Sequence, residues 1–236
     1  MWNGNTGFRR LAGRGLAGLL LTGAVLMGGM ASLGAYAPLP GGIGFEVLRD
    51  GTAMGSHTLV FEQRGEDLHV TIEIDLAVQL AFVTLYRYEH RNHEVWRDGR
   101  LIAIKTTTDN DGDRYWVEGE ASAEGFHVRS TDGVFTAPAD VMPTSYWNPA
   151  FVDRSRLLDT QHGKMIEVQT QAVGEETLTV AGESLQAIRY RTTGAIALET
   201  WYTTKGAWVK TAFQAKGSNI EYTRLSAAGD AQSALR

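Results

Sequence analysis

Aromatic side chains with polar tips are the residues in this sequence best suited to hold a ligand. If segment 80–97 is extended, alternate side chains point to opposite sides, and Arg87, Glu89 and Arg91 share one of them. An aromatic side with polar tips is typical of a concave ligand pocket, and it is equally typical of a packed sheet core. The residues on the aromatic side are Phe82, Tyr86, Tyr88, His90 and Trp96.

Tyr146, Trp147 and Asn148 form a second aromatic group in a stretch without strand-like alternation. Large aromatic residues in a loop can form a lid over a cavity, or they can anchor the loop to a sheet. Both interpretations stay open from the sequence. Together with the five residues above, these three are the candidate ligand-binding residues.

Other patterns that could support catalysis or metal binding are incomplete. Residues 109–113 and Glu120 have the acid spacing of a calcium loop, but Arg114 stands where that loop requires glycine. His90 and His93 would point to opposite faces of a strand and could not share an ion. The chain has no G-x-S-x-G motif. The sequence therefore identifies no catalytic residue, no metal site and no cofactor, although a site assembled from distant residues stays open.

The amino-acid composition excludes several kinds of partner and site. The chain has 236 residues, no cysteine and a formal net charge of −5. The absence of cysteine rules out disulfides, a thiol nucleophile and a lipid-attachment cysteine. A net negative chain without a run of Lys or Arg is repelled by nucleic acid.

The N-terminal segment has the features of an export signal. Arg9, Arg10 and Arg14 precede an uncharged apolar stretch that ends in the small-x-small triplet at Ala35 and Ala37. We predict a signal peptide at residues 1–37, with an uncleaved membrane anchor as the alternative, and hence a periplasmic location. Residues 38–44 read as a spacer, 45–225 as a single domain and 226–236 as a disordered tail.

The domain alternates apolar and polar residues with a period of two, most clearly over residues 68–79, and turn residues such as Asp50-Gly51 separate the runs. We expect an all-β fold of about a dozen antiparallel strands in a curled meander, as a half-barrel or open barrel rather than a flat sandwich. Asn148 followed by Pro149 predicts the start of one short helical insertion near 149–158.

Four segments carry a resemblance to a known family: Phe45 to His57, Tyr86 to Gly99, Ser145 to Pro149, and Trp201-Tyr202. Across about residues 44–224 the chain resembles an uncharacterised proteobacterial envelope family catalogued as a domain of unknown function. The resemblance implies a periplasmic β-protein and no activity. The layout is also distantly similar to periplasmic half-barrels that carry lipids or lipoproteins, which is a likeness of architecture alone.

Three functions are compatible with these features. The first is a non-enzymatic periplasmic binding or carrier module for a hydrophobic or amphiphilic ligand, such as a lipid. The second is a structural or assembly protein that docks another envelope protein, and the third is an unrecognised hydrolase. The shape and lining of the largest cavity would separate them.

Overall fold

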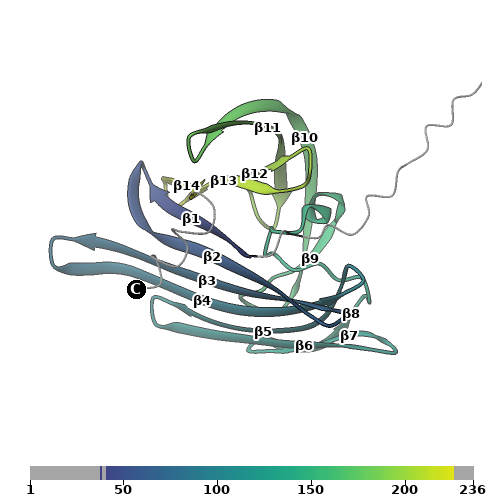
Figure 1. Cartoon of the computed structure of the whole chain (residues 1–236). Helices are drawn as coiled ribbons and strands as arrows, with labels where there is room; N and C mark the ends of the chain where they lie inside the picture. The colour runs from purple at the N-terminus through teal and green to yellow at the C-terminus, as the bar shows by residue number, and fades with distance from the viewer. Residues whose placement is uncertain (1–37, 39–40, 226–236) are drawn as a thin grey trace, which may run out of the picture. The chain divides into compact units, whose positions relative to one another are not determined.

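The computed structural model describes residue 38 and residues 41–225, which belong to one compact unit (Figure 1). The predicted signal peptide at 1–37 and the predicted tail at 226–236 lie outside these residues. Over the described part of the chain, no helix is long and apolar enough to cross a membrane.

The described chain forms one unclosed sheet of fourteen strands, in which all neighbouring strands are antiparallel, and this confirms the predicted all-β meander. The first and last strands, β1 and β14, pair in the middle of the sheet, and β8 and β9 form its two edges. The strands are β1 Gly41–Arg49, β2 Thr52–Arg64, β3 Asp67–Leu80, β4 Val83–Arg97, β5 Arg100–Asn110, β6 Asp113–Ser122, β7 Gly125–Ser130, β8 Gly133–Ala137, β9 Arg156–Leu158, β10 Met165–Val180, β11 Glu183–Gly194, β12 Leu198–Thr203, β13 Trp208–Ala215 and β14 Ser218–Arg224.

Short turns connect these strands where the sequence predicts them. In the turns Asp50-Gly51, Asp98-Gly99 and Asp111-Gly112, both residues have positive φ, as a type I′ hairpin requires. Aspartate tolerates this left-handed conformation better than most residues, and glycine adopts it without a steric penalty.

The sheet curves strongly, so that residues of distant strands meet on its concave face. His57 of β2 and Trp208 of β13 are three strand spacings apart, which is about 14 Å on a flat sheet. Their ring centroids are only 5.4 Å apart. The main hydrophobic core lies on this face, and Phe45, Phe61 and Trp96 are among its buried residues. The fold is therefore the predicted open barrel, with its core inside the curve.

Residues 138–163, which we call the insertion, run from the end of β8 past β9 and contain the predicted helical insertion near 149–158. Asn148 caps a helical turn by accepting a hydrogen bond from the Ala150 amide, and Pro149 is its first residue. This element, η1 Pro149–Asp153, is a 3-10 helix and is shorter than expected. The chain then extends, because Arg156–Leu158 pairs with β10 as strand β9.

The predicted spacer is also shorter than expected. Strand β1 begins at Gly41, whose register partner on β2 is Phe61. Ile43 is buried in the core, so residues 41–44 contribute both backbone pairing and apolar burial. Glycine-rich composition suggested a linker, but alternation around Ile43 lets these residues continue the strand.

Substitution of Gly119 tests the close packing of the core between β6 and β7. A Cβ at Gly119 would lie 2.3 Å from Cε1 of Phe126, which is fully buried and cannot move into solvent. We expect Gly119→Ala to lower the free energy of unfolding by about 1–3 kcal/mol in a urea titration.

The variant Phe126→Leu, which removes the ring, is the control. Combined with Gly119→Ala, it should lose less stability than the two single variants together, because the smaller side chain at position 126 relieves the clash. An unchanged stability of Gly119→Ala would contradict the observed packing.

Candidate functional site: the concave face of the sheet

A buried carboxylate organises one end of the concave face. Oε2 of Glu94 accepts hydrogen bonds from the indole N–H of Trp96 at 2.9 Å and of Trp147 at 3.0 Å. Oε1 accepts a third bond, of 2.9 Å, from the side-chain amide of Asn92. Glu94 lies on β4 and Trp147 on the insertion, so the carboxylate fastens the insertion to the sheet.

Burial raises the pKa of the Glu94 carboxyl, and the hydrogen bonds from Trp147, Trp96 and Asn92 oppose this by lowering it. The glutamate is completely inaccessible to solvent. Asn92 Oδ1 has no hydrogen-bond partner among the described residues. A rotation of this amide would therefore supply an acceptor for a protonated Glu94.

Three of the predicted ligand-binding residues lie at this buried end. Trp96 and Trp147 are 3% and 1% exposed, and their rings contact each other edge to face with centroids 5.2 Å apart. Trp147 also packs edge-on against Phe61. Asn148 is the helix cap described above. Here the aromatic residues pack on one another and anchor the insertion.

A second aromatic group lies farther along the concave face, around His57. The ring of His57 packs edge to face against Tyr222 and Trp208, with centroid distances of 5.6 and 5.4 Å. Neither ring nitrogen of His57 has a hydrogen-bond partner among the described residues. Burial lowers the pKa of His57 to about 3, so the ring is neutral in the folded protein.

The predicted residues Tyr88 and His90 neighbour this group. The His90 ring is buried, and its Nδ1 lies 2.8 Å from the hydroxyl of Thr108. Burial lowers the pKa of His90 to about 4. The Tyr88 hydroxyl donates a 3.3 Å hydrogen bond to the Gln161 side chain, which belongs to the insertion. Burial also raises the pKa of Tyr88, which keeps it a neutral donor.

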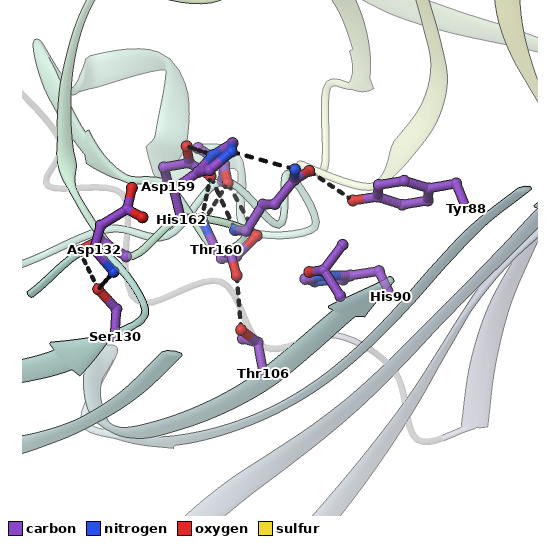
Figure 2. Close-up of polar contacts among 12 residues, drawn as sticks. Tyr88, His90, Thr106, Ser130, Asp132, Asp159, Thr160 and His162 are labelled. Atoms are coloured by element: carbon purple, nitrogen blue, oxygen red, sulfur yellow. Dashed lines mark hydrogen bonds and ion pairs between the residues drawn. The ribbon is translucent and has the colours of Figure 1, made fainter. Parts of the chain in front are cut away.

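Figure 2 shows how this part of the insertion is held above the sheet. Asp159 Oδ2 lies 2.8 Å from Nδ1 of His162, and the Thr106 hydroxyl donates to the backbone carbonyl of Thr160 at 2.7 Å. The other ring nitrogen of His162 lies 3.3 Å from the Gln161 amide. Since an amide is no nucleophile, this acid–histidine pair positions the loop and does not form a nucleophilic triad.

Beyond these residues, the concave face is only partly covered. Ile74, Leu76 and Val78 continue the inward-facing row of β3, and all three are half-buried. Tyr86, opposite Val78 on β4, is also half-buried, and its hydroxyl donates a 2.9 Å bond to Asn110. We call this region, with Tyr88, the open end of the concave face.

The opposite wall of the open end comes from the β13–β14 hairpin. The ammonium group of Lys216 lies 4.8 Å from the ring centroid of Tyr86. Phe213, which is half-buried, packs against Tyr222 with a centroid distance of 6.1 Å. The curvature of the sheet thus brings strands from both halves of the meander around the open end.

The last two predicted residues have different surroundings. Tyr146 has positive φ, and its ring packs edge-on against Phe151 and Trp208, so it belongs to the packed core under the insertion. Phe82 lies at the tip of the β3–β4 hairpin and is fully exposed at 104%. The structure therefore separates the eight candidates and leaves Tyr86, Tyr88 and His90 close together.

The opposite face of the sheet carries a separate hollow. A groove of about 710 Å³ crosses β4 to β8, and in its lining Glu118 forms ion pairs with Lys105 and Arg129. His93 also lines it and contacts His69 at 3.2 Å, so His90 and His93 do face opposite sides. Residues 41–225 contain no group of three or more acidic or histidine side chains arranged to hold a metal ion.

Sequence reasoning missed Glu94, His57 and Gln161. Glu94 lies on the same side of its strand as the buried Trp96, and His57 on the same side as Leu59. A polar residue on the apolar side of a strand was therefore the sequence feature that could have identified both. No local pattern could identify Gln161, because its contact with Tyr88 spans 73 positions.

Variants of Glu94 test its role as the anchor of the insertion. We expect Glu94→Leu to lose about 3–5 kcal/mol of unfolding free energy, because two buried indole N–H groups lose their acceptor. Glu94→Gln should lose clearly less, because its carbonyl still accepts and a rotated Asn92 can receive its amide. Chemical denaturation measures both, and equal losses would contradict this assignment.

The two buried histidines predict acid destabilisation. Their folded pKa values are lowered, so below about pH 6.5 the unfolded chain binds protons that the folded chain does not. Stability should therefore fall from pH 6.5 towards pH 4 for His90 and towards pH 3 for His57. The raised pKa of Glu94 acts in the opposite direction, because acid favours its folded, protonated form.

His57→Phe isolates one histidine. It should be at least as stable as the parent at pH 7, since it removes two unpartnered nitrogens. Its stability should also fall less steeply with acid, by up to about 1.4 kcal/mol per pH unit. Thermal unfolding at pH 4 to 7 measures this, and parallel curves for variant and parent would show that His57 does not titrate as described.

Comparisons with known proteins agree with the fold and indicate no activity. No curated protein matches this chain. A solved structure from Brucella abortus, described as a beta-barrel-like protein of domain of unknown function DUF1849, has a TM-score of 0.55 and 6% sequence identity. The match covers 78% of this chain and 95% of that one, which shows a shared barrel-like fold.

Family membership follows from the sequence comparison. The family described as a domain of unknown function, DUF6134, matches residues 45–225, which include nearly all of the sheet. The chain therefore belongs to the DUF6134 family.

Proposed function

We propose that this protein is a non-enzymatic binding or carrier protein of the cell envelope, which holds the apolar part of an amphiphile against the open end of its concave face. The observation that carries the proposal is the half-buried row of Ile74, Leu76 and Val78. These residues continue the inward face of a strand whose earlier members, such as Ile72, are buried in the core. A ligand would complete this burial at about 25 cal/mol per Å² of apolar surface.

Polar groups beside this row suit the head group of an amphiphile. The hydroxyls of Tyr86 and Tyr88 pair with the side chains of Asn110 and Gln161, which have further hydrogen-bonding capacity. Lys216 adds one positive charge at the rim. An apolar wall with a few convergent polar groups is the usual lining of a small-molecule site. The favoured ligand is a long-chain amphiphile with a neutral or acidic head group.

Location in the envelope is part of the proposal. It is supported by the basic, apolar and small-x-small order of residues 1–37. The chain has no cysteine and forms no disulfides. Its folding is therefore compatible with an oxidising compartment such as the periplasm.

The groove on the opposite face supports a ligand site less well. In its lining, Glu118 already forms ion pairs with Lys105 and Arg129, so these three charged side chains are satisfied within the protein. In the described chain, the His162 ring nitrogens are near Asp159 and the Gln161 amide, and no hydroxyl is among their hydrogen-bond partners, which weighs against hydrolysis.

The test is binding of a hydrophobic probe and of oleate to the full chain. Native mass spectrometry of protein purified from the envelope should detect a bound amphiphile, and N-phenyl-1-naphthylamine should fluoresce on binding and be displaced by oleate. Val78→Gln should weaken probe binding by about tenfold, because it places an amide in the apolar wall.

Val60→Gln is the matched control. Val60 lies on β2, is 39% exposed and points away from the buried Leu59 and Phe61. The control should bind the probe like the parent. Failure of the parent to bind either ligand, or equal weakening by both substitutions, would overturn the proposal.

A further inference from the structure

The hairpin that joins β3 and β4 extends beyond both of its neighbours in the sheet (Figure 1). Pairing of β2 with β3 ends where Gly55 meets Leu76, and pairing of β5 with β4 ends where Asn110 meets Tyr88. One more backbone bond, from the Asp111 amide to the Arg87 carbonyl, marks its base. We call residues 77–87 the β3–β4 arm.

The tip of the arm is apolar and exposed. Seven large hydrophobic side chains are exposed in the described part of the chain, and three of them cluster at this tip. Phe82, Val83 and Leu85 are 104%, 60% and 56% exposed. The sequence has no charged residue between Asp75 and Arg87. Such a concentration of exposed apolar surface indicates a surface that another phase or molecule covers.

Polarity changes in one direction along the arm. The apolar tip is followed by Tyr86 with the Lys216 ammonium over its ring, and then by the ion pair of Arg87 and Glu89 at the base. A protein-docking patch has a polar rim on all sides. In contrast, apolar residues, then tyrosine, then charge is the order of groups met from the acyl region of a bilayer to its surface.

The size and the backbone of the tip also favour a lipid surface. The tip spans only residues 79–85, whereas a stable protein interface uses about 20–30 residues on each side. Beyond Leu76 and Tyr88, the outer backbone edges of the arm pair with no strand among the described residues, apart from the bond at Arg87. Because unpaired backbone groups are costly in hydrocarbon, insertion would be shallow.

We propose that the tip of the β3–β4 arm inserts Phe82, Val83 and Leu85 into the surface layer of a lipid bilayer. This contact does not depend on ligand binding at the open end, although Val78 and Tyr86 at the base of the arm would then face the membrane surface. The acidic turn at Asp109, Asp111 and Asp113 lies beside the base. Apolar burial, not head-group charge, therefore drives the contact.

The cysteine-free chain allows a site-specific probe. Phe82→Cys in the full chain, labelled with the polarity-sensitive fluorophore NBD, should shift its emission to the blue and brighten with phosphatidylcholine vesicles. Anionic lipid should not strengthen the response. Val134→Cys is the control, because Val134 is 64% exposed on β8, and its label should not respond.

A second measurement separates the arm from the open end. Phe82→Ser/Val83→Ser/Leu85→Ser should weaken flotation with vesicles by roughly tenfold or more and should keep probe binding. Val78→Gln should show the reverse. Failure of ligand binding and failure of membrane binding are thus distinguishable.

Three outcomes would overturn the membrane contact. One is an unchanged NBD signal at position 82, and another is an equal response at position 134. The third is a response at position 82 without lipid, caused by raising the protein concentration or by adding a second envelope protein, since this would assign the tip to a protein partner.

Discussion

The hydrogen bonds to the Glu94 carboxylate are the interaction on which the rest of the concave face depends. The sheet is unclosed, and the chain passes from one edge strand, β8, to the other, β9, within the insertion. One carboxylate binds an indole from β4 and an indole from that insertion. Because both indoles are buried, loss of this acceptor would leave donors unsatisfied in the core.

This anchor divides the concave face into two parts. At one end, Trp96, Trp147 and Phe61 pack together and fill the space under the insertion. At the other end, the insertion contacts the sheet partly through polar contacts, such as that of Gln161 with Tyr88. The apolar row of β3 continues past this limit with only partial cover, and the proposed ligand site and the β3–β4 arm both lie there.

Local chemistry made much of the fold predictable. Alternation and Asp-Gly turns identify strands and hairpins because both depend on neighbours in sequence. The helical prediction failed beyond Asp153, because pairing with β10 extends the chain there. The surroundings of individual side chains were harder to predict. Trp96 and Phe82 belong to the same alternating pattern in the sequence, yet Trp96 donates to Glu94 and Phe82 is fully exposed at the tip of its hairpin. The exposure of Phe82 arises because β3 and β4 are longer than their neighbours, and the lengths of several strands cannot be read from one segment.

The division of the concave face is the central claim, and hydrogen–deuterium exchange with and without oleate tests it most directly. Added oleate should slow exchange at residues 74–78 and 86–90 and leave residues 92–96 and 145–150 unchanged, since these are already slow. Protection centred on Trp96 and Trp147, or no protection anywhere, would contradict the account.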